Sequence, residues 1–156
     1  MESERKQYVL PMEAIIQLME AAFSQGGSYC LVVTGTSMSP TLKPGRDMVR
    51  LVNSEGRKLR RHDLVFARRR CGGYMLHRVV KLHADGTATL NGDGQVWLED
   101  VDEILALAEA IRRKGKWISV DNVWYRLYVF FWAFTRPVRN SLVSLKKWLQ
   151  RGGKKG

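Results

Sequence analysis

The sequence is poor in cysteine and has no long apolar run. Its 156 residues include two cysteines, Cys30 and Cys71. Two cysteines are too few for the disulfide framework of a small secreted domain, and their separation does not form a CxxC metal or redox motif. We interpret them as buried or incidental thiols, and we expect neither a metal ion nor another cofactor.

The sequence also lacks a segment that could cross a membrane as an apolar helix. The longest apolar stretch, residues 123–134, contains Arg126 and is far shorter than the roughly 20 residues that a transmembrane helix needs. Residues 1–7 mix acids with bases, and Pro11 and Glu13 interrupt the apolar residues that follow, so we expect no signal peptide. These features predict a protein of the cytoplasm or of a membrane surface.

Acidic residues are missing from the C-terminal part of the chain. The net charge is +11, and all 15 acidic residues lie at or before Asp121. Lysine and arginine occur eight times in residues 122–156, so the excess positive charge is concentrated there. An uncompensated basic segment of this kind favours an anionic partner.

Composition divides the chain into three parts, which are an N-terminal helical segment (1–27), a β-rich domain (28–120) and a basic, aromatic, amphipathic helical tail (121–156). Apolar side chains at helical spacing predict a helix over residues 11–23. In the tail, the same spacing predicts two helices, 123–134 and 138–150, with a break at Arg136-Pro137.

The β-rich part consists of short apolar runs separated by turn residues. These runs predict strands at 30–33, 47–52 and 63–68, and a hairpin formed by 74–83 and 87–90. Residues 103–112 (EILALAEAIR) are ambiguous, because their leucines and alanines favour a helix while their alternation would also suit a strand.

Residues 34–42 (TGTSMSPTL) are the most informative segment. Ser37 follows an apolar run and precedes a Pro-Gly turn, an arrangement that can present its hydroxyl at the edge of a sheet. Backbone N–H groups of such a turn can face a developing oxyanion. A serine hydroxyl needs an adjacent base to act as a nucleophile, whereas a lone serine in a turn ordinarily serves as a capping or turn residue.

Three histidines could supply that base. His77 lies in the predicted strand 74–83, where a histidine on the apolar face is ordinarily a core residue. His62 lies beside two arginines in a turn, and His83 follows the strand. We expect both of these to face solvent.

Several segments, taken in order, resemble the sequence boxes of the signal peptidase I family, which belongs with the LexA-type self-cleaving peptidases. Residues 35–42 (GTSMSPTL) resemble the serine box, residues 76–80 (LHRVV) resemble the second box, and residues 90–93 (LNGD) resemble the Gly-Asp box. In the second box, His77 stands where the bacterial housekeeping enzymes of the family carry lysine, so the resemblance is to the Ser/His branch.

Weaker likenesses extend the match over about residues 28–117. The turns at 44–47 and 61–65 look like the family's Gly-Asp turns before strands, with Arg46 and His62 in place of glycine. Residues 104–116 look like the late strand that closes the family's β domain. The resemblance therefore implies a mainly β fold, a signal-peptidase/LexA-like β-ribbon domain with a short N-terminal helix and a C-terminal helical tail.

The resemblance also implies roles for individual residues. Ser37 would be the nucleophile and His77 the general base. The oxyanion hole would use the Ser37 backbone N–H within the turn formed by Gly35, Thr36 and Met38.

An acid that orients the histidine is implied after the Gly-Asp box. Asp93, Glu99 and Asp100 are the candidates. The asparagine that usually follows Gly-Asp is Gly94 here, and the choice among the three acids stays open.

These residues predict a serine endopeptidase that cleaves a peptide or protein precursor, bound in extended form with small residues near the cut. The alternative is a catalytically weak binding or regulatory module of the same fold, which the irregular Gly-Asp box and the lack of an apolar anchor suggest. The arginine run at 68–70 raises a third class, nucleic-acid binding. No recognisable DNA-binding motif accompanies it, so we do not expect a nucleic-acid partner.

The tail has three possible uses that the sequence leaves open. Residues 123–151 could contact an anionic membrane surface peripherally, since aromatic and basic residues suit the headgroup region. They could equally pack on the β domain or dock on another protein.

Overall fold

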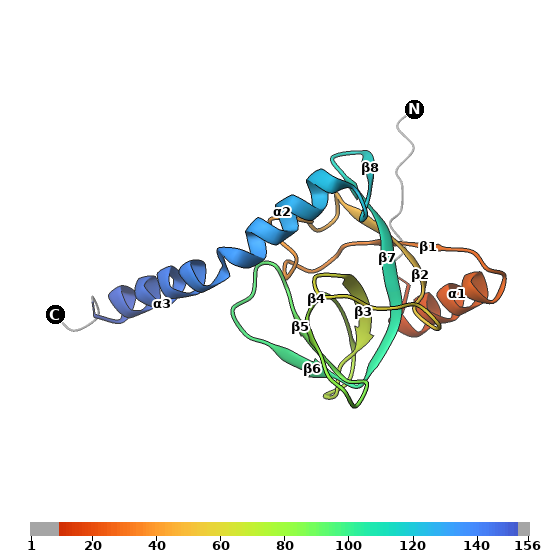
Figure 1. Ribbon diagram of the computed structural model, residues 1–156, viewed down its shortest axis with the longest axis horizontal. Coiled ribbons are helices and arrows are strands. Elements are labelled where there is room, and N and C mark those ends of the chain that lie inside the picture. The colour runs from red at the N-terminus through yellow and green to blue at the C-terminus, as the bar shows by residue number, and fades with distance from the viewer. Residues whose placement is uncertain (1–9, 153–156) are drawn as a thin grey trace.

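The structure is a computed structural model in which residues 10–152 are described. One helix precedes an antiparallel β domain and two helices follow it (Figure 1). The elements, in chain order, are α1 (Met12–Ser24), β1 (Tyr29–Val32), β2 (Met48–Asn53), β3 (Leu64–Arg68), β4 (Tyr74–Leu82), β5 (Ala88–Asn91), β6 (Glu99–Val101), β7 (Glu103–Arg113), β8 (Lys116–Ser119), α2 (Val123–Phe134) and α3 (Arg136–Gly152).

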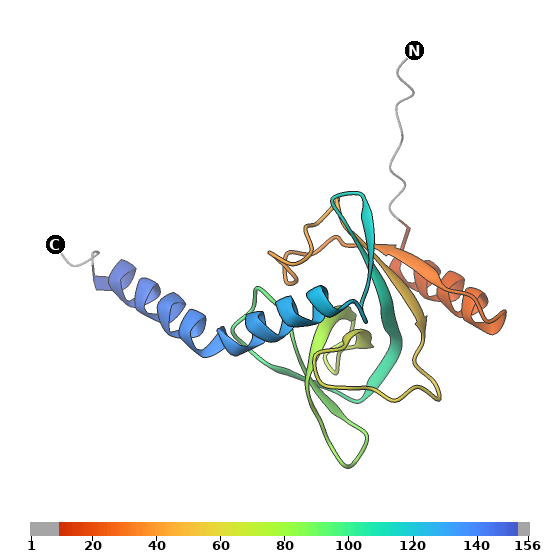
Figure 2. The same ribbon diagram turned by 45° about the horizontal axis from the view of Figure 1, so that its top comes forward.

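The strands form one open sheet. Within the described residues its eight strands follow the order β1-β2-β7-β3-β4-β5-β6, and β8 pairs with β7. Every pairing is antiparallel, and Figure 2 shows the sheet twisted rather than flat. The expectation of a mainly β fold with a short N-terminal helix and a helical C-terminal tail is confirmed.

β7 decides the ambiguous segment in favour of a strand. It pairs with β2, β3 and β8, and Ala106 and Ala108 on it are fully buried. A helix there would leave backbone N–H and C=O groups of β2 and β3 without partners in the middle of the sheet. Strand pairing therefore outweighs the helical propensity of the alanines and leucines.

Two hydrophobic clusters pack on opposite faces of the sheet. Along β3, Leu64 and Phe66 belong to the first cluster, and Val65 and Ala67 belong to the second, as the alternation of side chains in a strand requires. The first cluster also contains apolar residues from outside the sheet, which are Ile16 and Met19 of α1, Met38 and Leu42 of the segment before β2, and Tyr125 and Val129 of α2. The segment around Ser37 and the helix α2 are thus joined by one core.

The two tail helices follow each other almost directly. The Asn122 side chain caps α2 by accepting hydrogen bonds from the N–H groups of Trp124 and Tyr125. The expected break at Arg136-Pro137 is wrong by a residue or two, because α3 starts at Arg136 and includes Pro137. Proline is tolerated there because the first turn of a helix leaves N–H groups without partners.

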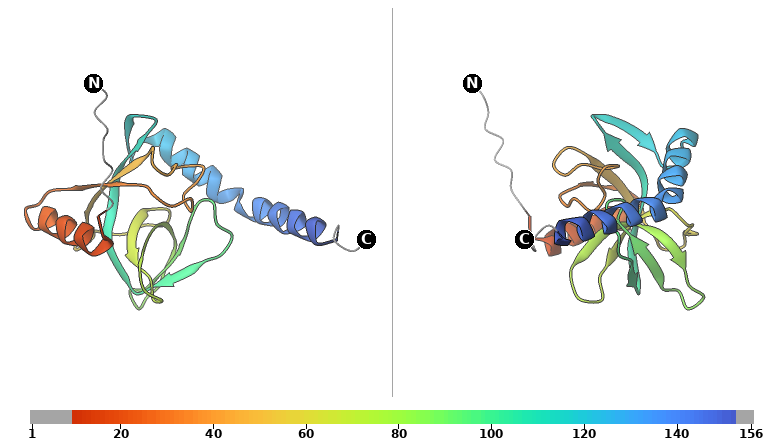
Figure 3. Two further views of the ribbon diagram at one scale, coloured as in Figure 1. Left: turned by 180° about the vertical axis from the view of Figure 1, so that it is seen from behind. Right: turned by 90° about the vertical axis from the view of Figure 1, so that its left-hand side faces the viewer.

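α3 extends away from the β domain (Figure 3). No helix formed by residues 10–152 combines the length and the apolar character needed to cross a bilayer.

The arginine run at the end of β3 is compensated by acids. Arg68 pairs with Glu103 at 3.2 Å, and Arg69 and Arg70 pair with Glu99 and Asp102. These ion pairs tie the β3–β4 turn to β6 and to the start of β7. The run is therefore not an uncompensated basic patch.

Both cysteines are free thiols. Cys30 and Cys71 are exposed. Of the two interpretations from the sequence, buried or incidental thiols, the first is therefore wrong.

Candidate active site

Ser37 lies in an irregular turn between β1 and β2. The Ser39 N–H donates to the Thr36 carbonyl at 2.9 Å, which folds the chain back on itself around Ser37. Met38 and Leu42, which follow Ser37, are buried and anchor the turn in the core. The Ser37 side chain is half-buried, while Gly35 and Thr36 are exposed beside it.

The buried carboxylate of Asp47 holds the second half of this turn. It accepts hydrogen bonds from the Lys43 N–H at 2.8 Å and the Lys114 N–H at 3.2 Å, and it pairs with the Arg46 guanidinium. The Arg46 guanidinium is the main reason why the pKa of Asp47 is lowered to about 2. The Pro-Gly turn that resembled a family box is thus a structural brace for the segment that carries Ser37.

His77 lies on β4, paired in register with Val65 of β3. Its side chain is 3% exposed, and its Nδ1 atom is buried with no hydrogen-bond partner among residues 10–152. Burial lowers the pKa of His77 to about 4, the Glu99 charge opposes that shift, and the Arg69 charge adds to it. The imidazole is therefore neutral at neutral pH, which is the state that can accept a proton.

Ser37 and His77 line the same cleft, which has a volume of about 570 Å³. The serine turn, α1, β1 and the start of β4 form its walls. Its apolar lining includes Tyr29, Leu31 and Phe66. The structure thus brings the two residues that the sequence singled out to one surface hollow, together with the turn residues Gly35, Thr36 and Met38.

The Gly-Asp box packs directly against the serine turn. The Gly94 N–H donates to the Ser37 carbonyl at 2.8 Å. A Cβ atom on Gly92 would lie 2.5 Å from the Ser37 carbonyl oxygen, and one on Gly94 would lie 2.6 Å from the Ser39 carbonyl oxygen. Glycine at 94, where the resemblance would place asparagine, is thus required by the close approach of the two loops.

Asp93, the first candidate for the orienting acid, pairs with Arg78 instead of His77. Its carboxylate accepts from Arg78 Nε at 2.8 Å, and both side chains are buried. His77 and Arg78 are neighbours on β4, so their side chains point to opposite faces of the sheet. Asp93 therefore lies on the Arg78 side of the strand.

Glu99 and Asp100, the other two candidates, are also engaged elsewhere. Glu99 forms a two-point ion pair with Arg69 at 2.7 and 2.8 Å, and Asp100 accepts a hydrogen bond from Thr89. Glu99 is the acid whose charge acts most strongly on His77. Among the described residues, none of the three acids forms a hydrogen bond with His77.

The remaining histidines are less exposed than the sequence suggested. His62 is half-buried, with its backbone in the left-handed region at a φ of 75°, and burial lowers its pKa. His83 is half-buried as well, and its Nε2 lies 2.8 Å from Thr89 Oγ1. Neither of them lines the cleft that contains Ser37.

Gln95 is a cleft residue that the sequence analysis did not single out. It lines the hollow beside Ser37 and His77, and its Oε1 atom is buried without a hydrogen-bond partner among the described residues. Its position three residues after Gly92 in the loop that meets the serine turn was the only available signal. A neutral amide at this place could orient a peptide group of a bound ligand.

The inner face of α2 supports the site from behind. Tyr125 accepts a hydrogen bond from Arg78 at 3.0 Å, the Tyr128 hydroxyl lies 3.1 Å from Thr41 Oγ1, and Trp132 Nε1 donates to the Asp93 carbonyl at 3.0 Å. Through these contacts the single helix α2 is bonded to β4, to the serine turn and to the Gly-Asp loop. Packing on the β domain was one of the three uses of the tail that the sequence left open. The first tail helix, α2, packs there.

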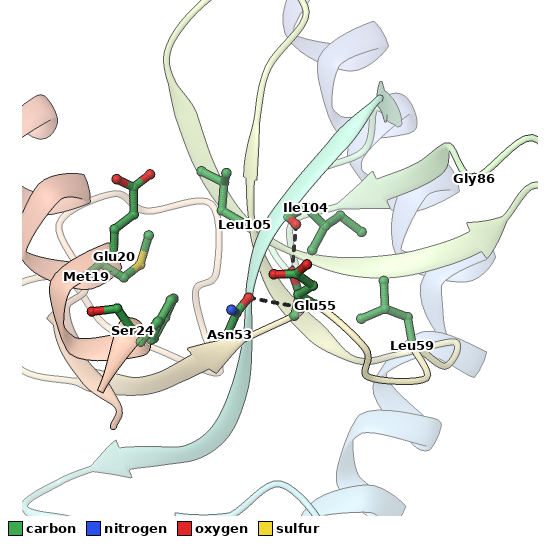
Figure 4. Close-up of a pocket in the computed structure, with 11 residues that line it drawn as sticks. Met19, Glu20, Ser24, Asn53, Glu55, Leu59, Gly86, Ile104 and Leu105 are labelled. Atoms are coloured by element: carbon green, nitrogen blue, oxygen red, sulfur yellow. Dashed lines mark hydrogen bonds between the residues drawn. The ribbon is translucent and has the colours of Figure 1, made fainter. Parts of the chain in front are cut away.

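A larger hollow of about 700 Å³ lies between α1 and the β2–β7 part of the sheet (Figure 4). The residues described as lining it include neither histidine nor lysine. Ser54 there is engaged, because its hydroxyl donates to the Ile104 carbonyl at 2.7 Å. Among the residues described, this hollow therefore holds no histidine or lysine that could serve as the base for its serines, Ser24 and Ser54.

Comparison with known proteins found no matching family model, no matching curated protein and no matching solved structure.

Proposed function

We propose that the protein is a serine endopeptidase of the signal-peptidase type, with Ser37 as nucleophile and His77 as general base. The observation that carries the proposal is that these two residues line one cleft and that His77 is neutral there. Nucleophilic catalysis by serine needs a neutral imidazole within reach of the hydroxyl, and the shared cleft supports that arrangement.

In this mechanism the Ser37 hydroxyl attacks the scissile carbonyl as His77 takes its proton, and His77 later delivers that proton to the leaving amine. The backbone N–H of Ser37 has no acceptor among the described residues, so it is free to stabilise the oxyanion. The acyl-enzyme is then hydrolysed by water, with His77 again as the base.

The position of β1 supports substrate binding in extended form. This strand ends the sheet order, so one edge of its backbone is unpaired, and residues 29–33 line the cleft. A peptide could add to that edge as a further strand, which supplies main-chain hydrogen bonds next to Ser37. The same placement supports the proposal that the sheet is a signal-peptidase/LexA-like domain.

One observation favours the alternative, a binding or regulatory module with weak turnover. His77 Nδ1 has no acid to orient it among the described residues, and the third member of a catalytic triad contributes strongly to rate. Such a module would bind precursor peptides in the same cleft without cutting them.

The test is cleavage of a panel of precursor peptides by the purified protein, together with labelling by a fluorophosphonate serine probe. Ser37→Ala and His77→Ala should abolish both cleavage and labelling. Ser39→Ala is the matched control, because Ser39 is half-buried in the same turn, and it should retain activity.

Cleavage that survives in Ser37→Ala would overturn the proposed mechanism. Peptides that bind to wild type and are released uncut would favour the binding module.

A further inference from the structure

α2 and α3 carry one continuous apolar stripe on the side that faces away from the β domain. It consists of seven side chains spaced three or four residues apart, which we call the outer stripe, namely Leu127, Phe131, Phe134, Val138, Leu142, Leu145 and Leu149. Their exposed fractions lie between 43% and 73%. Spacing of this kind places all seven on one face of a helix.

The junction between the helices preserves this alignment. Thr135 is the single residue between them, and its φ of −76° and ψ of −4° are close to helical. The Thr135 N–H donates to the Phe131 carbonyl at 3.0 Å, and the Arg139 N–H donates to the Thr135 carbonyl at 3.1 Å. The side chains after the junction therefore continue the row of those before it.

Aromatic residues widen the outer stripe, and no acid accompanies it. Trp124 and Trp148 are 79% and 70% exposed, and Phe130 stacks on Phe134. Every ionised side chain in residues 122–156 is basic, and these residues include Arg126, Arg136, Arg139 and Lys146. Arg126 lies 3.9 Å from the exposed Asp121, and the residues of α3 include no acid, so the helix pair joins an aromatic, apolar side to a net positive charge.

α3 has little of the tertiary packing that stabilises a helix. It extends away from the β domain (Figures 1 and 3), and its apolar side chains are largely exposed. Most of the stability of a helix in a protein comes from packing of its apolar side, and this 17-residue helix has little of it. A partner that covers the outer stripe is therefore expected.

We propose that the outer stripe docks into the interfacial region of an anionic lipid bilayer, with α2 and α3 lying in the plane of the membrane. The apolar and aromatic side chains would enter the boundary between headgroups and acyl chains, and the basic residues would remain among the anionic headgroups. A second copy of the chain is a poorer occupant, because its helices would bring charges of the same sign together.

The β domain does not cover the outer stripe, so it does not block contact between the stripe and a bilayer. It is attached to the opposite side of α2, where Tyr125 and Val129 are buried in the core. A bilayer on the outer stripe and the β domain therefore occupy different faces of the same helix. The proposal does not depend on peptidase chemistry.

The test is sedimentation of the full chain with vesicles made of equal parts of phosphatidylcholine and phosphatidylglycerol, compared with vesicles of phosphatidylcholine alone. We expect strong binding to the anionic vesicles and weak binding to the neutral ones. Because headgroup attraction is screened by salt, binding to the anionic vesicles should weaken as the salt concentration rises.

Two variants separate the apolar contribution from the charge. Leu142→Gln/Leu145→Gln/Leu149→Gln should bind anionic vesicles at least about ten-fold more weakly, because three leucines that would enter the bilayer interface are lost. Lys146→Glu/Lys147→Glu should weaken the same binding by about ten-fold or more.

Each variant has a matched control in the β domain or α1. Leu18→Gln/Leu82→Gln/Leu98→Gln changes three exposed leucines, and Lys58→Glu/Lys81→Glu changes two exposed lysines. Both controls should bind the anionic vesicles as wild type does. Far-ultraviolet circular dichroism of every variant shows whether the β domain is intact.

The proposal is overturned if the wild-type protein stays in the supernatant with anionic vesicles, or if the controls lose as much binding as the outer-stripe variants. It is also overturned if sedimentation velocity without lipid shows a concentration-dependent dimer that the leucine variant abolishes while vesicles are not bound. That result would assign the outer stripe to a second copy of the chain.

Discussion

The two faces of α2 are both rich in aromatic residues, yet only one of them is buried. The inner face presents Tyr125, Tyr128 and Trp132, whose polar atoms bond to Arg78, Thr41 and the Asp93 carbonyl. The outer face presents phenylalanine and leucine side chains that remain largely exposed. A buried tyrosine or tryptophan requires a partner for its polar atom. The β domain supplies such partners on one side of the helix, and this selects which face docks.

The largest expected effect comes from removing the charge of Arg78, the buried arginine that contacts the inner face of α2. Arg78→Met would leave the buried Asp93 carboxylate without its partner, which costs about 3–5 kcal/mol of the free energy of unfolding. Urea denaturation measures the loss. Arg126→Met is the control, because Arg126 and Asp121 are exposed and 3.9 Å apart, and its effect should stay within about 0.5 kcal/mol. Equal losses in the two variants would contradict the difference between the faces.

The residue before Arg78 on β4 sharpens the comparison, because His77 lines the cleft without a partner for Nδ1 among the described residues. Its pKa is about 4 in the folded state and 6.5 ordinarily, so the unfolded chain takes up the proton first as the pH falls. The free energy of unfolding should therefore decrease between pH 6.5 and about pH 4, by about 3 kcal/mol. Above pH 6.5 this contribution is absent.

The measurement is urea denaturation of wild type and His77→Gln across that pH range. The difference between their slopes isolates His77, since His62 also has a lowered pKa and contributes to both proteins. Parallel pH profiles for the two proteins would show that His77 is not held neutral by burial.

A smaller effect is expected at the loop that Trp132 of the inner face holds in place. Gly94→Ala would put a methyl group 2.6 Å from the Ser39 carbonyl oxygen, so the two loops must separate at a cost of about 2 kcal/mol. Gly35→Ala is the matched control, because its Cβ would meet nothing within 4 Å. Thermal unfolding compares the two. A stable Gly94→Ala variant would show that the loops are not interlocked.

The smallest effect compares the two faces of α2 directly. Tyr125→Phe removes the hydroxyl that accepts from Arg78 and should cost about 1.5 kcal/mol. Phe130→Leu changes an outer side chain that is 57% exposed and should change the free energy of unfolding by less than about 0.5 kcal/mol. Chemical denaturation of both variants without lipid gives the comparison, and a larger loss in Phe130→Leu would reverse it.

Local patterns predicted most of the elements close to where they lie. The first helix, the three early strands and the 74–83/87–90 hairpin agree with α1, β1, β2, β3, β4 and β5 to within a residue or so. These predictions rest on the spacing of apolar side chains and on turn residues, which are properties of neighbouring positions. The short strands β6 and β8 were not predicted, because a run of three or four residues carries little periodicity.

The acids near the cleft show where local reasoning stops. Asp93, Glu99 and Asp100 were equivalent in the sequence, and the structure gives each of them a different partner. Arg69 and Glu99 are 30 positions apart in the chain, so their ion pair depends on the strand order of the whole sheet. The same holds for Gln95, which reaches the cleft only because its loop packs on the serine turn.

The sequence by itself determined the mainly β character, the helical tail and the two residues worth testing, Ser37 and His77, because periodicity and short motifs are encoded locally. Only the tertiary structure decided that 103–113 is a strand, that α2 docks on Arg78, Thr41 and the Gly-Asp loop, and that the outer stripe remains exposed. The physical reason is the same in each case: burial and hydrogen-bond partners come from segments distant in the chain, and they outweigh the preferences of single residues.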